Sequence, residues 1–595
     1  MGLLSFSFFA VFLFLCGVSL SSKTEQSEVD AINAIHSHWK LSKLNVTGDP
    51  CDHSDTSANP GIVCDCSPTV CHITQLKIYA LDIYGTIPQA LFNLTELTNL
   101  NLGQNVLDGP IPAEIGKLTK MQYLSLGINN LTGPVPAELG KLTKLISLSF
   151  GSNNLNGPLP SQLGNLISLQ QLYIDSSGVS GPIPQELSNL KSLQILWASD
   201  NRFTGKIPEF LGNLTGLKVL RLEGTNLEGP IPIGFAALTK LEDLLRQEGH
   251  PTRIGDLDAS GSSLDFVENL TSLSTLSLRN CRIRGEILEK LSSFPKLLFL
   301  DLSFNMLKRQ IPASFKKSSS LQYLYLGSNN LSGDLPSDIM NSSLVALDVS
   351  FNNLTGSVPL LGEDKSINVV GTSINDANLN ENATNMLRCL QGRTKCSSNH
   401  SSTSFSVSSG GPRQSSFDDD SEHLGAASLY AGAESRWAVS SNGLFISNPK
   451  DYLDLDKAKT DSQVTNTLNS ELYKTARVAP SSLRYYGLGL ENVLYKVELH
   501  FAEIQMDDSS STSWKALGRR LFDVYIQGEK VLEDFNILNE AGGSKTALVK
   551  EFTTNVTNTV MDIHLFWAGK GTCCIPLQST FGPLISAIHV SRNVS

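Results

Sequence analysis

Aromatic side chains beside glycines are the residues of this chain whose types suit contact with a sugar ring. The segment SLRYYGLGLEN (482–492) carries Tyr485 and Tyr486, and RWAVSSNGLF (436–445) carries Trp437. Such rings combine an apolar face with a polar edge, which suits a glycan, but they equally suit a packed core. The next segment, YKVELHFAEI, alternates apolar and polar residues, which indicates a half-buried strand. The sequence therefore predicts glycan-binding candidates at these three aromatics, with core packing as the favoured alternative.

A second candidate surface follows from the residues that flank inward leucines in repeated LxL strands. Side chains alternate across a strand, so these neighbours point to the opposite face. Binding hot spots favour aromatic residues and arginine, although aromatics on a sheet also pair across strands. The ligand-binding candidates are Tyr123, Tyr173, Trp197, Arg221, Glu223, Arg279, Phe299, Asp301, Tyr323 and Tyr325.

The sequence shows no clear pattern of catalytic residues. Glu503, Asp507 and Asp508 are acidic. Their spacing gives no evidence for the pair of facing carboxylates that a glycosidase needs. The net charge of −11 argues against nucleic acid as the main partner, since no basic stripe is present to neutralise phosphates. We therefore expect a binding protein without catalytic residues, metal or cofactor.

The amino-terminal 22 residues, MGLLSFSFFAVFLFLCGVSLSS, read as a cleaved signal peptide, with a signal anchor as the alternative. No later stretch reaches about 18 apolar residues. Recurrent Asn-x-Ser/Thr triplets support an extracellular location. The predicted glycosylation sites are Asn45, Asn93, Asn130, Asn213, Asn269, Asn330, Asn341, Asn353, Asn382, Asn399, Asn555 and Asn593.

The elements that must position the second candidate surface are leucine-rich repeats. The pattern LxxLxLxxNxLxGxIP runs from about Ile73 to Pro359, at intervals of 24 residues. Each LxL strand buries its leucines, and stacked strands build one continuous parallel sheet. The repeat count is about twelve, and the eighth repeat carries eight extra residues near Gln247 to Thr252. This insertion either forms a functional loop or reflects an error in the sequence.

Cysteines at both ends of the repeats predict solenoid caps, which such folds require. In a secreted chain these clusters favour disulfides, with connectivity open. The predicted disulfide residues are Cys51, Cys64, Cys66 and Cys71 before the repeats, and Cys389 and Cys396 after them. Zinc binding at the first cluster is disfavoured, because His36 and His38 do not share one face of the helical segment EVDAINAIHSHWK. Cys281 occupies the position at which most repeats have the consensus asparagine, and it is expected to be a buried thiol.

Beyond a serine-rich linker, the chain changes character. Short alternating segments, YKVELHFAEI, RRLFDVYIQG, LVKEFTTNV, VMDIHLFWAG and PLISAIHV, are separated by turns. This pattern indicates an antiparallel β-sandwich. The fold class is thus mainly β with short helices, a leucine-rich-repeat solenoid followed by the sandwich. The expected divisions are signal peptide 1–22, cap 23–72, repeats 73–360, cap and linker 361–402, and sandwich 403–591.

RWAVSSNGLF, SLRYYGLGLEN, FAEIQ, LGRRLFDVYIQG and HLFWAGKGTCCIP with GPLISAI together resemble the malectin domain of plant leucine-rich-repeat receptor-like serine/threonine kinases. The repeat segments KIYALDIYGTIP and IDSSGVSG agree with this resemblance. In that family a membrane helix and a cytoplasmic kinase follow the ectodomain. These residues contain no kinase elements, because DFN (534–536) is not DFG and no HRD loop occurs.

The resemblance also implies what the sugar site of animal malectin would need. That site uses tyrosine-rich loops, an aromatic pair after the FAE strand and an aspartate near the last strand. Tyr485 matches one tyrosine, but Ile504, Gln505 and Met506 follow FAE, and Phe581 occupies the aspartate position. The animal sugar site is therefore largely not retained. Ser409 replaces a family cysteine, which leaves nine cysteines after Cys16 is removed.

The first functional hypothesis is the extracellular ligand-recognition region of a plant receptor-like kinase. Its partners would be a peptide, protein or cell-wall glycan, together with a co-receptor kinase, and no nucleic acid. As written the chain is secreted, and it would lie on the outer face of the plasma membrane if the full gene adds a membrane helix. The alternative is a secreted receptor-like protein that acts as a decoy or inhibits a wall-degrading enzyme.

Overall fold

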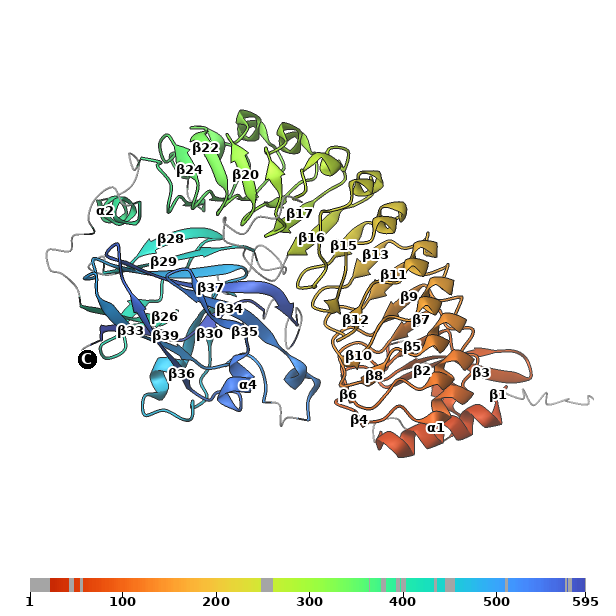
Figure 1. Ribbon diagram of the computed structural model, residues 1–595. Coiled ribbons are helices and arrows are strands. Elements are labelled where there is room, and N and C mark those ends of the chain that lie inside the picture. The colour runs from red at the N-terminus through yellow and green to blue at the C-terminus, as the bar shows by residue number, and fades with distance from the viewer. Residues whose placement is uncertain are drawn as a thin grey trace, which may run out of the picture.

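The computed structural model describes an arched solenoid and a β-sandwich that lies inside its curve (Figure 1). The described residues are 22–41, 48–53, 57–247, 261–362, 364–375, 381–391, 396, 403–432, 436–444, 455–508, 512–572, 575 and 581–593. Residues 1–21 of the predicted signal peptide, part of the predicted insertion and part of the predicted cap and linker lie outside them. Within the described part of the chain, no helix is both long and apolar enough to cross a membrane.

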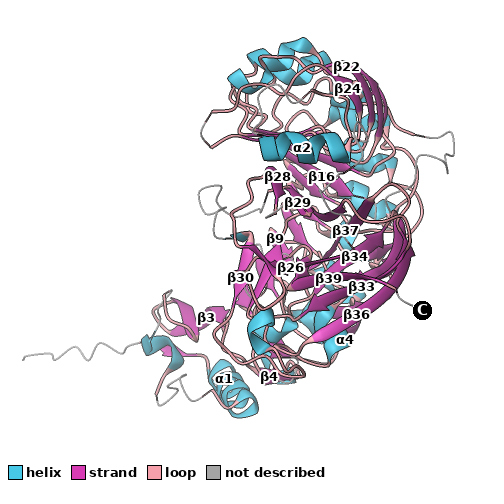
Figure 2. Ribbon diagram, turned by 90° about the vertical axis from the view of Figure 1, so that its left-hand side faces the viewer, coloured by secondary structure: helices cyan, strands magenta, loops and turns pink. Residues whose placement is uncertain are grey.

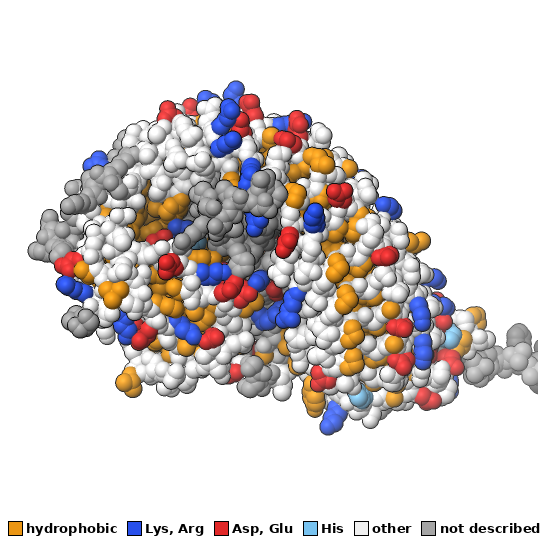
Figure 3. All heavy atoms as spheres, viewed as in Figure 1, with side chains coloured by type: hydrophobic (Ala, Val, Ile, Leu, Met, Phe, Trp, Pro, Cys, Tyr) orange, Lys and Arg blue, Asp and Glu red, His pale blue; other side chains and the backbone are white. Residues whose placement is uncertain are grey.

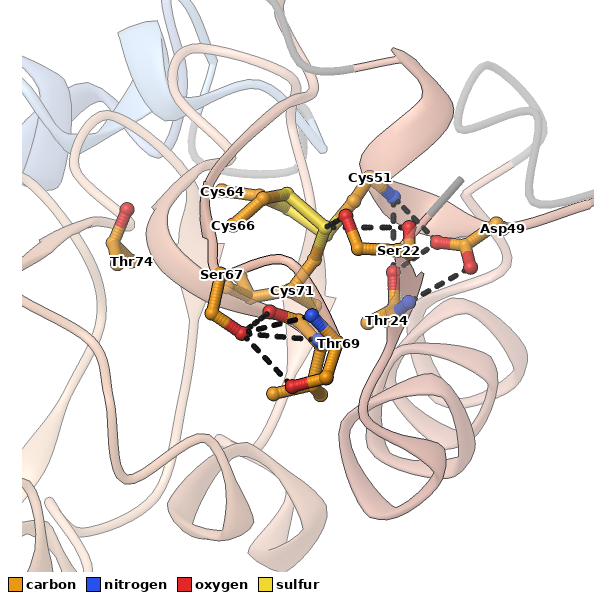
Figure 4. The surroundings of a disulfide bond; sticks show 12 residues. Ser22, Thr24, Asp49, Cys51, Cys64, Cys66, Ser67, Thr69, Cys71 and Thr74 are labelled. Carbon is orange, nitrogen blue, oxygen red and sulfur yellow. Dashed lines mark hydrogen bonds between the residues drawn. A yellow bond between two sulfur atoms is a disulfide. The ribbon is translucent and has the colours of Figure 1, made fainter. Parts of the chain in front are cut away.

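The amino-terminal cap closes the first edge of the solenoid. Helix α1 (Gln26–Trp39) begins where the Glu25 carboxylate accepts hydrogen bonds from two backbone amides, and it ends at Lys40 in the left-handed conformation. Its buried face, which includes Ile32, Ile35 and Trp39, packs into the solenoid core. Disulfides Cys51–Cys64 and Cys66–Cys71 tie the cap together, and Asp49 bonds the adjoining strand (Figure 4). The structure therefore assigns the disulfide pairing that the sequence left open.

The solenoid is built on one sheet, which lines the concave side. Every repeat contributes a short parallel strand whose central leucine is buried, as Leu100, Leu124 and Leu148 show. Burying each such leucine contributes roughly 1.5–3 kcal/mol before entropy costs. The repeat strands are β3 (Val70–Lys77), β5 (Asn99–Asn101), β7 (Tyr123–Ser125), β9 (Ser147–Ser149), β11 (Gln171–Tyr173), β13 (Ile195–Trp197), β15 (Val219–Arg221), β16 (Asp243–Gln247), β17 (Thr275–Arg279), β19 (Phe299–Asp301), β21 (Tyr323–Tyr325), β23 (Ala346–Asp348) and β25 (Ser366–Asn368). The cap adds β1 (Lys23–Thr24), parallel to β3, and β2 (Gly61–Cys66), antiparallel to β3.

A ladder of buried asparagines fixes the spacing of these strands. The Asn129 side chain donates to the carbonyls of Leu102 and Leu126 and accepts from the amide of Leu107. One side chain therefore bonds two adjacent repeats, and it satisfies backbone groups that a turn would otherwise leave unpaired. Asn105, Asn153, Asn305 and Asn329 repeat the arrangement.

The return path of each repeat carries short 3₁₀ helices on the convex side and small strand pairs between the two faces. The 3₁₀ helices are η1 (Pro50–His53), η2 (Gln89–Asn93), η3 (Ala113–Lys117), η4 (Ala137–Lys141), η5 (Ser161–Asn165), η6 (Gln185–Asn189), η7 (Glu209–Asn213), η8 (Ile233–Ala237), η9 (Asp265–Val267), η10 (Glu289–Ser293), η11 (Ala313–Lys317) and η12 (Ile339–Asn341). The small strands are β4 (Tyr84–Gly85), β6 (Val106–Leu107), β8 (Thr132–Pro134), β10 (Asn154–Asn156), β12 (Ser180–Gly181), β14 (Arg202–Phe203), β18 (Arg284–Gly285), β20 (Met306–Arg309), β22 (Asn330–Asp334) and β24 (Asn353–Thr355).

The carboxy-terminal cap extends the solenoid past residue 360, where the repeats were expected to end. Strand β25 adds one more strand beside β23. Helix α2 (Glu381–Leu390) then lies across the end of the sandwich (Figure 2), where Met386 and Cys389 pack against Tyr486 and Leu488. The disulfide Cys389–Cys396 closes this cap.

The carboxy-terminal domain is the predicted sandwich. One sheet has the order β27 (Asp418–Asp420), β26 (Ser404–Ser409), β39 (Ala587–Arg592), β33 (Leu494–Phe501) and β36 (Leu548–Asn555). The other has the order β28 (Ala427–Ala431), β29 (Trp437–Asn442), β32 (Ser482–Leu488), β37 (Val560–Gly571), β34 (Arg520–Ile526) and β35 (Glu529–Phe535). Smaller elements are β30 (Lys457–Lys459), β31 (Thr475–Val478), β38 (Leu584–Ile585), η15 (Ser470–Tyr473), η16 (Trp514–Leu517) and α4 (Ile537–Ala541).

Candidate functional site

The sandwich covers one half of the concave face and leaves the other half open. Tyr123 on β7 is 43% exposed, and Tyr173 and Trp197 are half-buried. Farther along the same sheet, Tyr323 and Tyr325 are only 5% and 1% exposed. The ten candidates on this face thus fall into two groups, and the strands up to β15 carry those that remain accessible.

The open half contains a stack of three side chains. Parallel, in-register pairing of β11, β13 and β15 sets Tyr173, Trp197 and Arg221 side by side. The rings of Tyr173 and Trp197 meet edge to face at 5.1 Å, and the Arg221 guanidinium lies 4.1 Å from the Trp197 ring centroid. Burial raises the pKa of Tyr173. The stack is a preformed amphipathic surface of the kind that binding sites favour.

Trp197 and Arg221 of this stack also line a small cavity between solenoid and sandwich. Glu223, Asp175, Trp567 and Phe581 contribute to its wall, and its volume is about 40 Å³. Glu223 is buried and accepts a hydrogen bond from the Ser199 hydroxyl. Burial raises the pKa of Asp175 to about 6, against the opposing effect of the nearby arginine on β15. A cavity of this size and polarity has room for water but not for a sugar.

The sandwich docks along a row of residues in the left-handed conformation. The residue before each ladder position has a positive φ, and Ser176, Asp200 and Gly224 belong to this row. The Ser176 hydroxyl donates to the carbonyl of Gly571 at 3.2 Å, and Arg519 pairs with Asp200 at 2.9 Å. Charged side chains of both signs meet along this seam (Figure 3). The row therefore serves as the edge on which the second domain rests.

The backbones of the two domains approach closely at a pair of glycines. A Cβ atom placed on Gly224 would lie 2.4 Å from the carbonyl oxygen of Gly569, and a Cβ on Gly569 would lie 2.8 Å from the amide nitrogen of Gly224. Both residues have positive φ values. Gly224 thus replaces the side chains found elsewhere in the row, at the point where the hairpin ending β37 touches the solenoid.

In the covered half, an arginine is enclosed between the domains. Arg279 is 2% exposed, and its guanidinium lies 4.8 Å from the ring of Phe304 and 4.6 Å from that of Phe566. Phe304 also stacks on His564. Burial lowers the pKa of Arg279 to about 10 and that of His564 well below its usual value. Arg279 therefore acts as a contact between domains.

The remaining candidates of the covered half also face the sandwich. Tyr323 and Tyr325 join the hydrophobic core of the sandwich, and Phe299 packs against the same cluster. The Asp301 carboxylate accepts bonds from the amide and hydroxyl of Ser303. The prediction that these side chains, with Arg279, contact an external ligand is corrected here. Sequence alternation identified the exposed face of an isolated solenoid, but a second domain of the same chain covers that part.

Several contact residues escaped the sequence reasoning. Phe304 and Phe351 occupy the left-handed row, where other repeats carry small or polar residues such as Ser176. The Arg484 guanidinium lies 4.2 Å from the Phe351 ring, and Asn442 donates to Asp348 at 2.6 Å. The sequence signal that could have identified them is an aromatic residue directly before a ladder asparagine. Such a side chain would lie in solvent if no second domain packed against the solenoid.

Comparison with known proteins assigns both domains. The malectin domain family matches residues 407–588, a leucine-rich repeat region matches residues 88–201, and further single repeats match 192–214, 272–294 and 320–342. The chain contains leucine-rich repeats followed by a malectin domain. Its curated relatives are named probable LRR receptor-like serine/threonine-protein kinases of Arabidopsis thaliana.

Two of these relatives give the extent of the match. One is 44% identical over 256 residues, which is 41% of this chain and 24% of the relative. Another is 36% identical over 345 residues, 57% of this chain and 32% of the relative. The chain thus spans about a quarter to a third of their length. Among solved structures, the LRR ectodomain of the Arabidopsis thaliana receptor kinase GASSHO1/SCHENGEN3 is 27% identical, with a TM-score of 0.49 over 59% of this chain and 44% of that one.

Two of the three glycan-binding candidates lie in the interior of the malectin domain, and the third, Tyr486, lies on the outer face of β32 against the carboxy-terminal cap. Trp437 and Tyr485 are 0% exposed and Tyr486 is 2% exposed. The Tyr485 hydroxyl donates to Asp420 at 2.7 Å, and Asp420 also pairs with buried Arg477. The Trp437 and Tyr485 rings cannot stack on a sugar while the domain is folded, so the structure favours the packing alternative for these two. Tyr486 packs against the cap and also lines a cleft. All three occupy central strands, where sequence alone does not distinguish a core ring from a loop ring.

Of the positions that the family resemblance connects with sugar, Phe581 faces the solenoid. Phe581 packs on Trp567 at 4.9 Å beside the small cavity. Gln505 accepts a hydrogen bond from Arg520, which also pairs with Glu503 at 2.8 Å. An ion-pair network and an aromatic stack therefore fill the region that the family resemblance marked as altered.

The glycosylation sites divide by exposure. Asn93, Asn213, Asn269, Asn330, Asn353, Asn555 and Asn593 are exposed, and Asn130 is half-buried. Asn45 and Asn399, and the side chains of Asn341 and Asn382, lie outside the described residues. Modification at the exposed sites remains a prediction.

Cys281 is buried in the ladder, where its amide donates to Asn305.

Proposed function

We propose that this chain is the extracellular ligand-recognition region of a plant receptor-like kinase, acting at the outer face of the plasma membrane. The kinase names of the relatives support this assignment, as do the two matched domain families. The signal peptide and sequons expected from the sequence agree with it. Phosphoryl transfer would need a kinase domain in addition to the repeats and the malectin domain.

The open half of the concave face is the proposed ligand surface. The observation that carries this proposal is the exposed Tyr123 ring, which lies on the same face as the Tyr173, Trp197 and Arg221 stack. Aromatic side chains supply contact area at low entropy cost, and arginine is enriched at binding hot spots. A peptide, a protein segment or a cell-wall glycan fits this chemistry, and a co-receptor kinase is the expected second partner.

The test is a binding screen with a matched tyrosine control. Synthetic secreted plant peptides and cell-wall oligosaccharides are screened by biolayer interferometry, and each binder is measured again on Tyr123→Ala, Tyr173→Ala and Tyr84→Ala. Tyr84 is 63% exposed but lies on the small strand β4, outside the concave sheet. We expect the concave-face variants to weaken binding about tenfold or more, as hot-spot truncations do, and Tyr84→Ala to leave it unchanged. Binders that all three variants retain at full affinity would refute the surface.

A further inference from the structure

A large cleft separates the carboxy-terminal cap of the solenoid from one end of the malectin domain. Its volume is about 1220 Å³, which exceeds the roughly 300–1,000 Å³ of pockets for drug-sized ligands. Its walls come from the last repeat and α2 on one side, and from the turns at 491–493, 527–528 and 556–559 on the other. The cleft is remote from the Tyr173 stack, and none of its lining residues belongs to the proposed ligand surface.

The lining of this cleft is rich in hydrogen-bonding groups and carries two acidic residues, Glu529 and Asp562. Side-chain amides come from Asn492, Gln527, Asn555 and Asn558, and threonine hydroxyls come from β36 and the turn that follows it. Amides and hydroxyls both donate and accept, so they match the hydroxyl groups of a carbohydrate. An apolar wall that includes Phe351 suits the CH face of a sugar ring.

One acceptor in the cleft lacks a partner in the described part of the protein. Asp562 lines the cleft, and its Oδ1 atom is buried without a hydrogen bond, while Oδ2 accepts from Arg484 at 3.4 Å. Burial raises the pKa of Asp562. A buried carboxylate oxygen without a donor is unfavourable by about 1–3 kcal/mol. The Oδ1 atom itself is closed to the cleft, but the Asp562 side chain as a whole is 28% exposed at the cleft wall.

The chain itself carries an attachment point for such an occupant. Asn555, Val556 and Thr557 form an N-glycosylation sequon at the end of β36. Asn555 and Thr557 are exposed and line the cleft, whereas Val556 is 2% exposed and faces the core. Strand alternation therefore directs the acceptor side chain to the cleft rather than to the interior. Any glycan on this asparagine starts from the cleft wall.

We propose that the N-linked glycan of Asn555 occupies this cleft and bridges the solenoid cap and the malectin domain. The inner sugars contact the turns of the malectin domain, and the following sugars reach the cap near Gln391, which also lines the cleft. The glycan thereby supplements the protein contacts that hold the two domains together. Asn213 provides the contrast, because it is exposed in η7 on the convex side.

The experiment compares glycan release at these two sites. The intact chain is produced in cells that attach only high-mannose glycans, is treated with endoglycosidase H in the native state, and is analysed by site-resolved mass spectrometry. We expect release at Asn555 to be at least about tenfold slower than at Asn213, which corresponds to about 1.4 kcal/mol of shielding, with equal rates after denaturation. Equal native rates, or an unmodified Asn555, would overturn the proposal.

Sequon variants give an independent measurement. Asn555→Gln removes the glycan, and we expect it to lower the melting temperature and to speed amide exchange at the turn 556–559. Thr557→Ser keeps the sequon and is expected to behave as wild type, while Asn213→Gln removes a glycan without either effect. If Asn555→Gln and Asn213→Gln are indistinguishable, the bridging role is wrong.

A last arm separates the attached glycan from a free one. Released high-mannose oligosaccharide is titrated into wild type and into Asn555→Gln by calorimetry. Binding to the variant alone supports an attached glycan that already fills the cleft. Binding to fully glycosylated wild type, or to neither protein, contradicts that occupant.

Discussion

The Gly224–Gly569 contact gives a sharp test of domain docking. In Gly224→Ala, the new Cβ would lie 2.4 Å from the carbonyl oxygen of Gly569. Non-bonded contacts sit at roughly 3.5 Å, so the hairpin must retreat by about 1 Å. That retreat would break the Ser176–Gly571 hydrogen bond, worth about 1 kcal/mol, and loosen the half-exposed Arg519–Asp200 pair, worth up to about 0.5 kcal/mol. The docked state should lose about 1.5 kcal/mol, or tenfold in its equilibrium constant.

The assay is hydrogen exchange with mass spectrometry on peptides that cover β37 and the solenoid row it contacts. We expect Gly224→Ala to speed exchange about tenfold there and to leave the amino-terminal repeats unchanged. Gly157→Ala is the matched control, because Gly157 also has a positive φ of 72° but has nothing within 4 Å of its Cβ position. It shares the left-handed strain without the clash. The docking argument fails if both variants exchange alike.

Three further outcomes follow from buried polar groups. Arg279→Met should destabilise the protein by about 2 kcal/mol through loss of two cation–π contacts, as measured by chemical denaturation. Arg282→Met, at an exposed arginine, should change stability little, and equal effects of the two variants would contradict the enclosed site. Because burial raises the pKa of Asp175 to about 6, its ionisation disfavours folding. Wild type should therefore gain melting temperature relative to Asp175→Asn as pH falls from 7 towards 4, and parallel pH profiles would refute this. Asn305→Ala should lower stability by about 2–4 kcal/mol, because it leaves buried backbone groups of two repeats unpaired; a loss below 1 kcal/mol would argue against the ladder's role.

Docking of the malectin domain changes how the concave face is understood. A solenoid alone would offer its whole inner sheet to a ligand. Here the inner sheet from β17 onward is used within the chain, since Arg279, Tyr323 and Tyr325 pack against the malectin domain. The accessible surface is confined to the amino-terminal strands and is bordered by the seam at Asp200 and Arg519. A ligand in the open half would therefore lie next to both domains.

Much of the architecture was predictable from the sequence. The 24-residue period determines the parallel sheet and the ladder, because each repeat must bury Leu100-type side chains against identical neighbours. Period-two alternation in 494–501 predicted β33, whose residues alternate between exposed or half-buried and buried. Cysteines at both ends predicted disulfide caps, although the pairing Cys51–Cys64 and Cys66–Cys71 required coordinates.

The sequence by itself therefore determined the local structure, namely which residues form strands, which side chains face inward and where the repeats end in caps. Only the tertiary structure decided which outward faces stay accessible. Tyr123 and Tyr323 occupy equivalent positions of their strands, yet one is 43% exposed and the other 5%. The reason is physical: periodicity is set by neighbours along the chain and in the next repeat, whereas docking depends on shape and contacts between residues such as Gly224 and Gly569, which lie hundreds of positions apart.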